Sequence, residues 1–206
     1  MTDVADWWQT DIIDMAPGQI RLRGFAIEDL IGNIGFAEMV WLMTRGTRPD
    51  AAQAALFEAA LVSAVDHGPQ APSIAAARMA VSCGLPLNNA MATAINMLGD
   101  VHGGAGEQAM QFFHAVKSHA GTMSLEAAID LVFHENNRLV PGFGHRFHKN
   151  ADPRSVRLMR LLETAVAEKT CTGQFAEIAL AIEAYLHKQK GKAIPMNVDG
   201  VTAVIY

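Results

Sequence analysis

Apolar residues recur every three or four positions along most of this chain, and polar residues fill the places between them. In residues 51–65, for example, Leu56, Ala59 and Ala60 share one face of a helix. The alternation of apolar and polar residues that favours strands is scarce. The pattern therefore predicts an all-α protein. Its expected helices are two short ones within 27–44, then 51–65, 74–82, 88–98, 107–118, 125–138, 154–168 and 174–189, before a short apolar segment at 196–206.

Helix ends are marked by capping and turn-forming residues. Asp50 and Ser124 are favourable N-terminal caps. Asp152-Pro153 is a typical helix start, because proline is tolerated in the first turn. A glycine-rich break at 103–106 divides the helices into two groups, and we expect a domain boundary there.

The longest stretch without charged residues runs from Met79 to Gly99 and is long enough to suggest a membrane span. Gly84, Pro86 and Asn88 interrupt it, so we expect two buried segments joined by a turn. The acidic residues 1–14 lack the basic and apolar regions of a signal peptide. The sequence thus predicts neither a membrane helix nor secretion.

The composition indicates a folded core and limits the possible partners. Half of the 206 residues are hydrophobic and 18% are charged, with 16 Lys and Arg against 21 Asp and Glu and a net charge of −5. Such a chain is a poor general binder of nucleic acid, although a local basic pocket for one phosphorylated cofactor stays open. The two distant cysteines, Cys83 and Cys171, exclude a disulfide scaffold and a thiolate zinc site. Reduced thiols in the cytoplasm are expected.

Three histidines stand out because each lies beside glycine at a break between helices: His67, His102 and His145. Such breaks expose backbone N–H groups that suit a small anionic ligand. Alternatively, each ring bonds a loop carbonyl. The spacings match no metal motif, so no metal is predicted. The other five histidines are expected within or beside charged helical faces (His114, His119, His134, His148 and His187).

Two charged residues have both a chemical and a structural interpretation. Apolar neighbours flank Asp199, and partial desolvation would raise its pKa and strengthen it as a base, but the residue could also cap a helix from Val201. Arg154 could bind a carboxylate through its forked guanidinium, or lie on the surface of a first helical turn. Likewise, the basic stretch 188–192 could neutralise phosphates or simply end a helix.

Several of these segments, taken together and in order, resemble the citrate synthase superfamily. An upstream Arg-Gly motif at 22–25 with 27–30 belongs to the resemblance, which runs from about residue 20 to the end. The segments are Val65-Asp66-His67-Gly68, Gly99-Asp100-Val101-His102-Gly103-Gly104, Pro141-Gly142-Phe143-Gly144-His145-Arg146 with Asp152-Pro153-Arg154, and Asn197-Val198-Asp199-Gly200.

Details of the motifs point to two branches of the superfamily. Segments 66–69 and 197–200 resemble the citryl-CoA lyase module of ATP-citrate lyase, and the short chain resembles stand-alone citryl-CoA lyases. Segment 101–104 resembles citrate synthase instead. The direction of the reaction therefore stays open, with citryl-CoA lyase favoured. Citrate synthase, a related acyl-CoA/2-oxo acid synthase and a catalytically silent subunit are the alternatives.

The resemblance implies a site for acyl-CoA and oxaloacetate or citrate, with no metal. Asp199 would take the methyl proton of acetyl-CoA, while His102 and His145 would donate hydrogen bonds to the thioester and keto oxygens. The dicarboxylate would be held by His67 and Arg154. Coenzyme A would be bound by Pro141, Gly142, Phe143, Gly144 and Lys192.

The resemblance also implies a helical homodimer with a larger and a smaller domain. The large domain would contribute residues 1–103, the small domain 104–193, and 194–206 would return to the large domain. The family has further arginines after its aspartate motif, whereas seven residues follow Asp199 here. Either those arginines are absent or the chain is a C-terminally truncated fragment.

Overall fold

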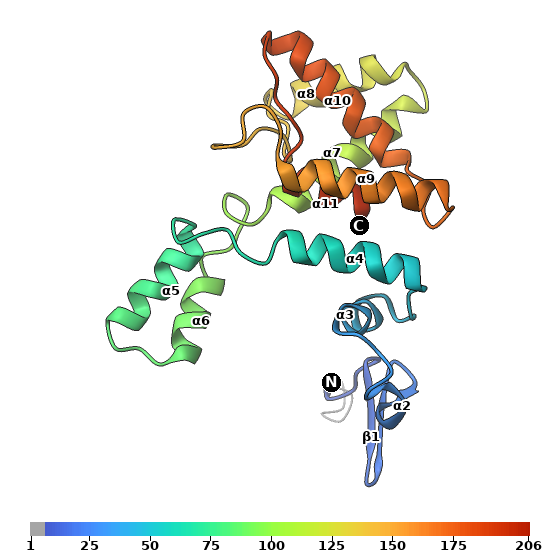
Figure 1. Ribbon diagram of the computed structural model, residues 1–206, viewed down its shortest axis with the longest axis vertical. Coiled ribbons are helices and arrows are strands. Elements are labelled where there is room, and N and C mark those ends of the chain that lie inside the picture. Colours follow the sequence, from blue (N-terminus) through green and yellow to red (C-terminus); the bar gives the residue numbers. More distant parts are fainter. Residues whose placement is uncertain (1–6) are drawn as a thin grey trace. The chain divides into compact units, whose positions relative to one another are not determined.

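The computed structural model describes residues 7–206 and separates into two compact units (Figure 1). One ends at Glu58 and the other runs from Ala59 to Tyr206, so the boundary falls within helix α4 (Ala51–Ser63). The domain division expected at 103/104 and 193/194 concerns a whole two-domain enzyme and stays a prediction. Residues 1–6 of the expected large domain lie outside the described part of the chain.

The first unit contains a small sheet that the sequence pattern did not predict. Strands β1 (Ile13–Ala16), β2 (Gln19–Leu22) and β3 (Phe25–Ala26) pair antiparallel in that order. Arg23 and Gly24 both have positive φ, which suits the tight turn between β2 and β3. The Arg23 guanidinium donates to the Met43 carbonyl at 2.9 and 3.2 Å and ties this turn to the following helix.

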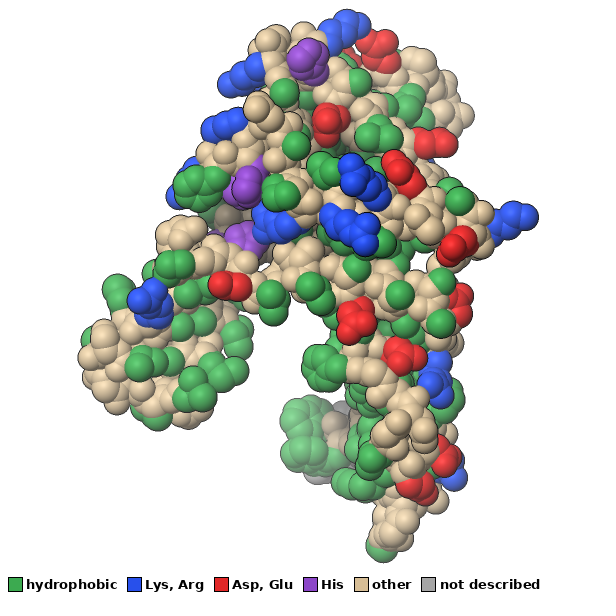
Figure 2. Space-filling view, in the orientation of Figure 1, with side chains coloured by type: hydrophobic (Ala, Val, Ile, Leu, Met, Phe, Trp, Pro, Cys, Tyr) green, Lys and Arg blue, Asp and Glu red, His purple; other side chains and the backbone are tan. Residues whose placement is uncertain are grey.

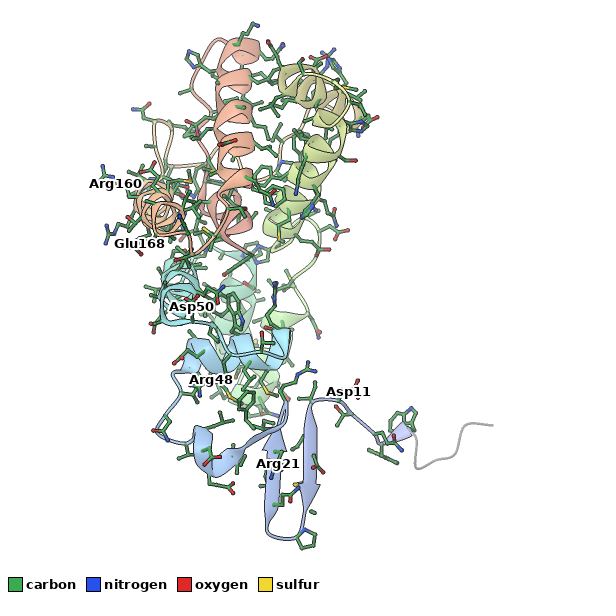
Figure 3. The ribbon with its side chains drawn as sticks, turned by 90° about the vertical axis from the view of Figure 1, so that its right-hand side faces the viewer. Asp11, Arg21, Arg48, Asp50, Arg160 and Glu168 are labelled. Atoms are coloured by element: carbon green, nitrogen blue, oxygen red, sulfur yellow. The ribbon has the colours of Figure 1, made fainter. Side chains whose placement is uncertain are left out.

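Helices follow the sheet as expected. The two short helices expected within 27–44 are α2 (Ile27–Leu30) and α3 (Phe36–Arg45), and α4 comes next. Asp50 caps α4, since its carboxylate accepts from the Gln53 backbone at 2.8 Å while the Gln53 side chain accepts from the Asp50 N–H (Figure 3). This N-terminal cap is confirmed.

The second unit is helical throughout its regular elements, which confirms the all-α fold class. Phe113, Val116, Ile129, Ile182 and Val201 are fully buried and form the centre of its core. The predicted cap Ser124 accepts from a backbone N–H group, and so does Asp152 at the predicted start of the helix from Arg154. The helices are α5 (Pro72–Ser82), α6 (Leu87–Ile95), α7 (Ala105–Ala120), α8 (Leu125–Glu135), α9 (Pro153–Ala167), α10 (Gln174–Lys190) and α11 (Val198–Ile205).

The charge-free stretch from Met79 to Gly99 contains the turn between α5 and α6, as expected, but much of it is not buried. Leu87 is 72% exposed and Ile95 is 62% exposed, and Met79 and Met91 are exposed as well. The expectation of two buried segments is therefore wrong for this chain alone. No helix between residues 7 and 206 is long and apolar enough to cross a membrane.

Candidate active site

Three loops of the second unit form an open cleft of about 700 Å³. The cleft brings together four residues singled out from the sequence: His67, His102, His145 and Arg154. Figure 2 shows histidine and basic side chains gathered on one side of this unit. The remaining lining residues are Asp66, Gln70, Ala71, Pro72, Arg146, Phe147, His148 and Pro153.

His102 is held by the N-terminus of α5. Its Nε2 lies 3.2 Å from the Ser73 backbone nitrogen and 3.0 Å from the Ser73 hydroxyl. A backbone N–H can only donate, so Nε2 is the acceptor and carries no proton. Free N–H groups at helix N-termini supply this kind of bond. The ring is therefore neutral, with its proton on Nδ1.

His145 is held in the opposite tautomer. Its Nδ1 accepts from the backbone N–H groups of Phe147 and His148 at 3.0 and 3.1 Å, which leaves the proton on Nε2. Burial lowers the pKa of the His145 imidazole, and the nearby His148, Arg154 and His67 lower it further, although Asp152 acts in the opposite sense. The neutral ring is thus favoured as a hydrogen-bond donor.

Arg154 does fork onto a carboxylate, but the carboxylate belongs to its own helix cap. Its Nε donates to Asp152 Oδ1 at 3.0 Å and its Nη2 to Oδ2 at 2.8 Å. Burial raises the pKa of the Asp152 carboxyl, yet the hydrogen bonds and charge of Arg154 outweigh this and hold it below the ordinary value. In the sequence, Asp152-Pro153 indicated a helix start and Arg154 a possible fork onto a carboxylate, but nothing linked the two as partners.

Asp199 does not line the cleft, and it is not the cap of its helix. Asn197 caps α11 instead, accepting from the Asp199 and Gly200 backbone at 2.9 and 3.2 Å. Asp199 lies in the first turn, partly buried, and its carboxylate makes no hydrogen bond or ion pair with residues 7–206.

The loop that precedes His145 is fixed to the start of α11 by backbone contacts. Gly144 N–H donates to the Pro195 carbonyl at 2.8 Å, and Asn197 N–H donates to the Gly142 carbonyl at 2.9 Å. The Asn197 side chain donates to the Gly144 carbonyl at 2.8 Å. These bonds join the segment of His145 to the segment of Asp199, whereas His102 reaches the cleft from another loop.

The residues expected to bind coenzyme A are divided between different surroundings. Pro141 borders a second cavity of about 510 Å³ that Leu139, Asn136 and residues of α7 and α8 also line. Gly142 is packed against α11, and the Phe143 ring lies edge-to-face with Phe113. These residues do not line the histidine cleft. Lys192 is exposed beyond the end of α10.

One histidine was placed wrongly from the sequence. His148 was expected at a charged helical face, but it lines the cleft, and its ring lies 4.6 Å from the His145 ring centroid. Its position three residues after His145 in a glycine-rich loop was the available signal. The predicted absence of a metal stays a prediction; no group of three or more metal-binding side chains occurs within residues 7–206.

The fold thus defines a helical protein in which three loops bring His67, His102, His145 and Arg154 into one cleft. A family model for the C-terminal domain of citrate synthase matches residues 43–206, and the chain therefore belongs to the citrate synthase family. The superfamily resemblance is confirmed.

Known relatives come from both branches. A citrate synthase of Deinococcus radiodurans is 35% identical over 80% of this chain, which spans only 42% of that protein. The citryl-CoA lyase of Hydrogenobacter thermophilus superposes with a TM-score of 0.84 at 35% identity, covering 96% of this chain and 75% of that one. Citrate synthase of Thermoplasma acidophilum, solved as a ternary complex with carboxymethyl coenzyme A and oxaloacetate, superposes with a TM-score of 0.65 at 26% identity, covering 84% of this chain and 45% of that one.

Proposed function

We propose that this protein cleaves citryl-CoA to acetyl-CoA and oxaloacetate. The observation that carries the proposal is the pair of neutral imidazoles, His102 and His145, held in opposite tautomers beside Arg154. The similarity to a citryl-CoA lyase, of which this chain spans three quarters, supports cleavage. The similarity to citrate synthases supports the second candidate, condensation followed by thioester hydrolysis.

Each imidazole has a distinct task. In the condensation direction, Asp199 takes a proton from the acetyl methyl group, and His102 Nδ1–H donates to the thioester oxygen as the enolate forms. His145 Nε2–H donates to the keto oxygen, so that the enolate carbon bonds to the ketone carbon. A well-placed donor of this kind contributes about 3–4 kcal/mol to the transition state. Cleavage runs through the same groups in reverse.

Substrate carboxylates are assigned to Arg154 and His67, whose side chains line the same cleft. The His67 ring makes no hydrogen bond with the described side chains or backbone and is free to donate to an anion. Coenzyme A is assigned to the cavity beside Pro141 and to the 142–144 loop that leads from it to His145.

Lys192 is assigned to a coenzyme A phosphate. Of the three lysines in this basic stretch, Lys188 is paired with Glu126 at 2.7 Å, and Lys190 lies over the Phe133 ring. Within the described chain, no such partner occupies Lys192. Its segment leads directly to Pro195, which bonds the 142–144 loop.

A homodimer is also proposed. The exposed apolar side chains of α5 and α6, among them Leu87 and Ile95, form a surface that a second copy would cover. Light scattering of the purified chain tests this assembly: a mass of one chain at micromolar concentration contradicts it.

Two assays test the catalytic proposal. Citryl-CoA is supplied first, and oxaloacetate is measured through added malate dehydrogenase and NADH. Acetyl-CoA and oxaloacetate are then supplied, and released thiol is measured. We expect oxaloacetate in the first assay; thiol release in the second alone identifies a synthase, and no product in either identifies a silent family member.

The variant Asp199→Asn tests whether Asp199 acts as the base or has only a structural role. The amide retains the shape of the side chain but cannot take a proton, so kcat should fall by about 10²–10⁴ while the melting temperature changes little. Glu168→Gln, at the exposed end of α9 (Figure 3), is the matched control and should retain full turnover. Undiminished turnover of Asp199→Asn contradicts the assignment.

A further inference from the structure

Asp152 is the most deeply buried charged residue in the described chain, at 1% exposure. Its carboxylate accepts three hydrogen bonds, all from Arg154: one from the backbone N–H, one from Nε and one from Nη2. Asp152 does not line the cleft; it borders a separate cavity of about 300 Å³. Arg154 is the cleft residue to which its carboxylate is hydrogen-bonded, while its charge also acts on His145 and His148.

The way Asp152 holds Arg154 decides which part of the guanidinium is available. A guanidinium has five N–H donors and two edges that can bind a carboxylate with two parallel bonds. Asp152 takes the side edge, formed by Nε and Nη2. The end edge, formed by Nη1 and the second proton of Nη2, stays free on a side chain that is 24% exposed.

Pro153 makes this arrangement rigid. Its ring fixes φ between the two partners, and Asp152 caps the same helix in which Arg154 is the second residue. Holding a long side chain in one conformation before the ligand arrives reduces the entropy that binding must remove. Because the Asp152 carboxylate neutralises the charge of Arg154, anion binding here depends on the geometry of the hydrogen bonds more than on net charge.

We propose that Asp152 is the positioning residue of the site, holding Arg154 so that its free end edge binds one carboxylate of the four-carbon acid. This inference rests on the proposed function for the identity of the ligand. Asp152 itself touches no substrate, and its effect is on binding rather than on the chemical step.

Three variants test the positioning role. Asp152→Ser retains an oxygen that can cap α9 but loses the fork, and Asp152→Asn retains one acceptor for the guanidinium. We expect KM for citryl-CoA, and Kd for citrate as a calorimetric probe, to rise about 10- to 100-fold in Asp152→Ser and less in Asp152→Asn. The kcat value should stay within about threefold. Ser155→Ala, one residue beyond Arg154 in the same buried turn, is the control and should keep both constants.

A spectroscopic measurement separates the two proposals. The Nε–H resonance of Arg154, assigned by its loss in Arg154→Lys, should be protected from exchange in the natural chain and unprotected in Asp152→Ser. Persistence of that protection, or an unchanged Kd for citrate in Asp152→Ser, overturns the positioning role. A natural chain that neither binds citrate nor turns over citryl-CoA overturns the proposed function instead, and with it the assignment of the free edge.

Discussion

Replacing Gly142 with alanine tests whether the loop before His145 is held by direct backbone packing. Gly142 has φ of +83°, and a Cβ there would lie 2.6 Å from Gly200 Cα and 3.1 Å from Ala109 Cβ. A non-glycine residue in this left-handed region costs about 1–3 kcal/mol, and forcing an extra methyl into a packed contact costs about 1–3 kcal/mol more. We expect Gly142→Ala to destabilise the fold by about 2–6 kcal/mol.

Thermal and urea unfolding measure this loss. For a chain of this size, 1 kcal/mol corresponds to about 2–4 °C in Tm, so the melting point should fall by at least about 4 °C. Gly106→Ala is the matched control: it lies in α7 with no atom near the added Cβ and should leave stability equal or slightly higher. A Gly142→Ala protein that melts within 2 °C of the natural chain, a threshold set at about half the expected minimum, refutes the packing argument.

Three further changes have defined outcomes. Ser73→Ala should keep kcat within about threefold, because the Ser73 backbone N–H still fixes the His102 tautomer; loss of activity contradicts that tautomer. In His148→Asn, a neighbour that lowers the pKa of His145 is gone. The neutral ring is lost as pH falls through this pKa, which lies below the ordinary histidine value in the natural chain, so the acid limb of kcat/KM should move to higher pH. Tyr185→Phe removes a 2.5 Å hydrogen bond between α10 and α8 and should lower the free energy of unfolding by about 1–2 kcal/mol, measured in urea.

The helices could be predicted because their apolar spacing and their capping residues agree. Asp50, Ser124 and Asp152 all cap the helices expected of them. The sheet was missed because its strands have only four, four and two residues, too few for an alternating pattern to emerge. Its available signals were the two short turns, Pro17-Gly18 between β1 and β2 and Arg23-Gly24 between β2 and β3.

Periodicity could not distinguish a buried apolar segment from an exposed one. The residues from Met79 to Gly99 carry no charge and are mostly apolar, as core residues are. Leu87 and Ile95 are nevertheless exposed on α6. Whether an apolar face is covered depends on what packs against it, which is a property of the assembly and not of the local sequence.

Of the candidate site, the sequence identified four residues that meet but not how they are held; it also included Asp199, which does not line the cleft, and missed His148, which does. His67, His102, His145 and Arg154 share a cleft, as the superfamily resemblance implied. Which nitrogen of each imidazole carries the proton depends on backbone N–H groups that only the folded loops bring into range. The fork between Arg154 and Asp152 likewise depends on rotamers, so a helix cap and a ligand-binding arginine could not be recognised as one unit.

Asn197 shows how a residue outside the catalytic set can join two of its members. Its amide nitrogen donates to the Gly144 carbonyl, next to His145, while its amide oxygen accepts from the N–H groups of Asp199 and Gly200. Only a side chain that is both donor and acceptor can make these bonds together. An aspartate here would keep the helix cap but set a carboxylate against a carbonyl oxygen. The position of the assigned donor His145 relative to the assigned base Asp199 therefore depends on the side-chain amide of Asn197 as much as on the chain between them.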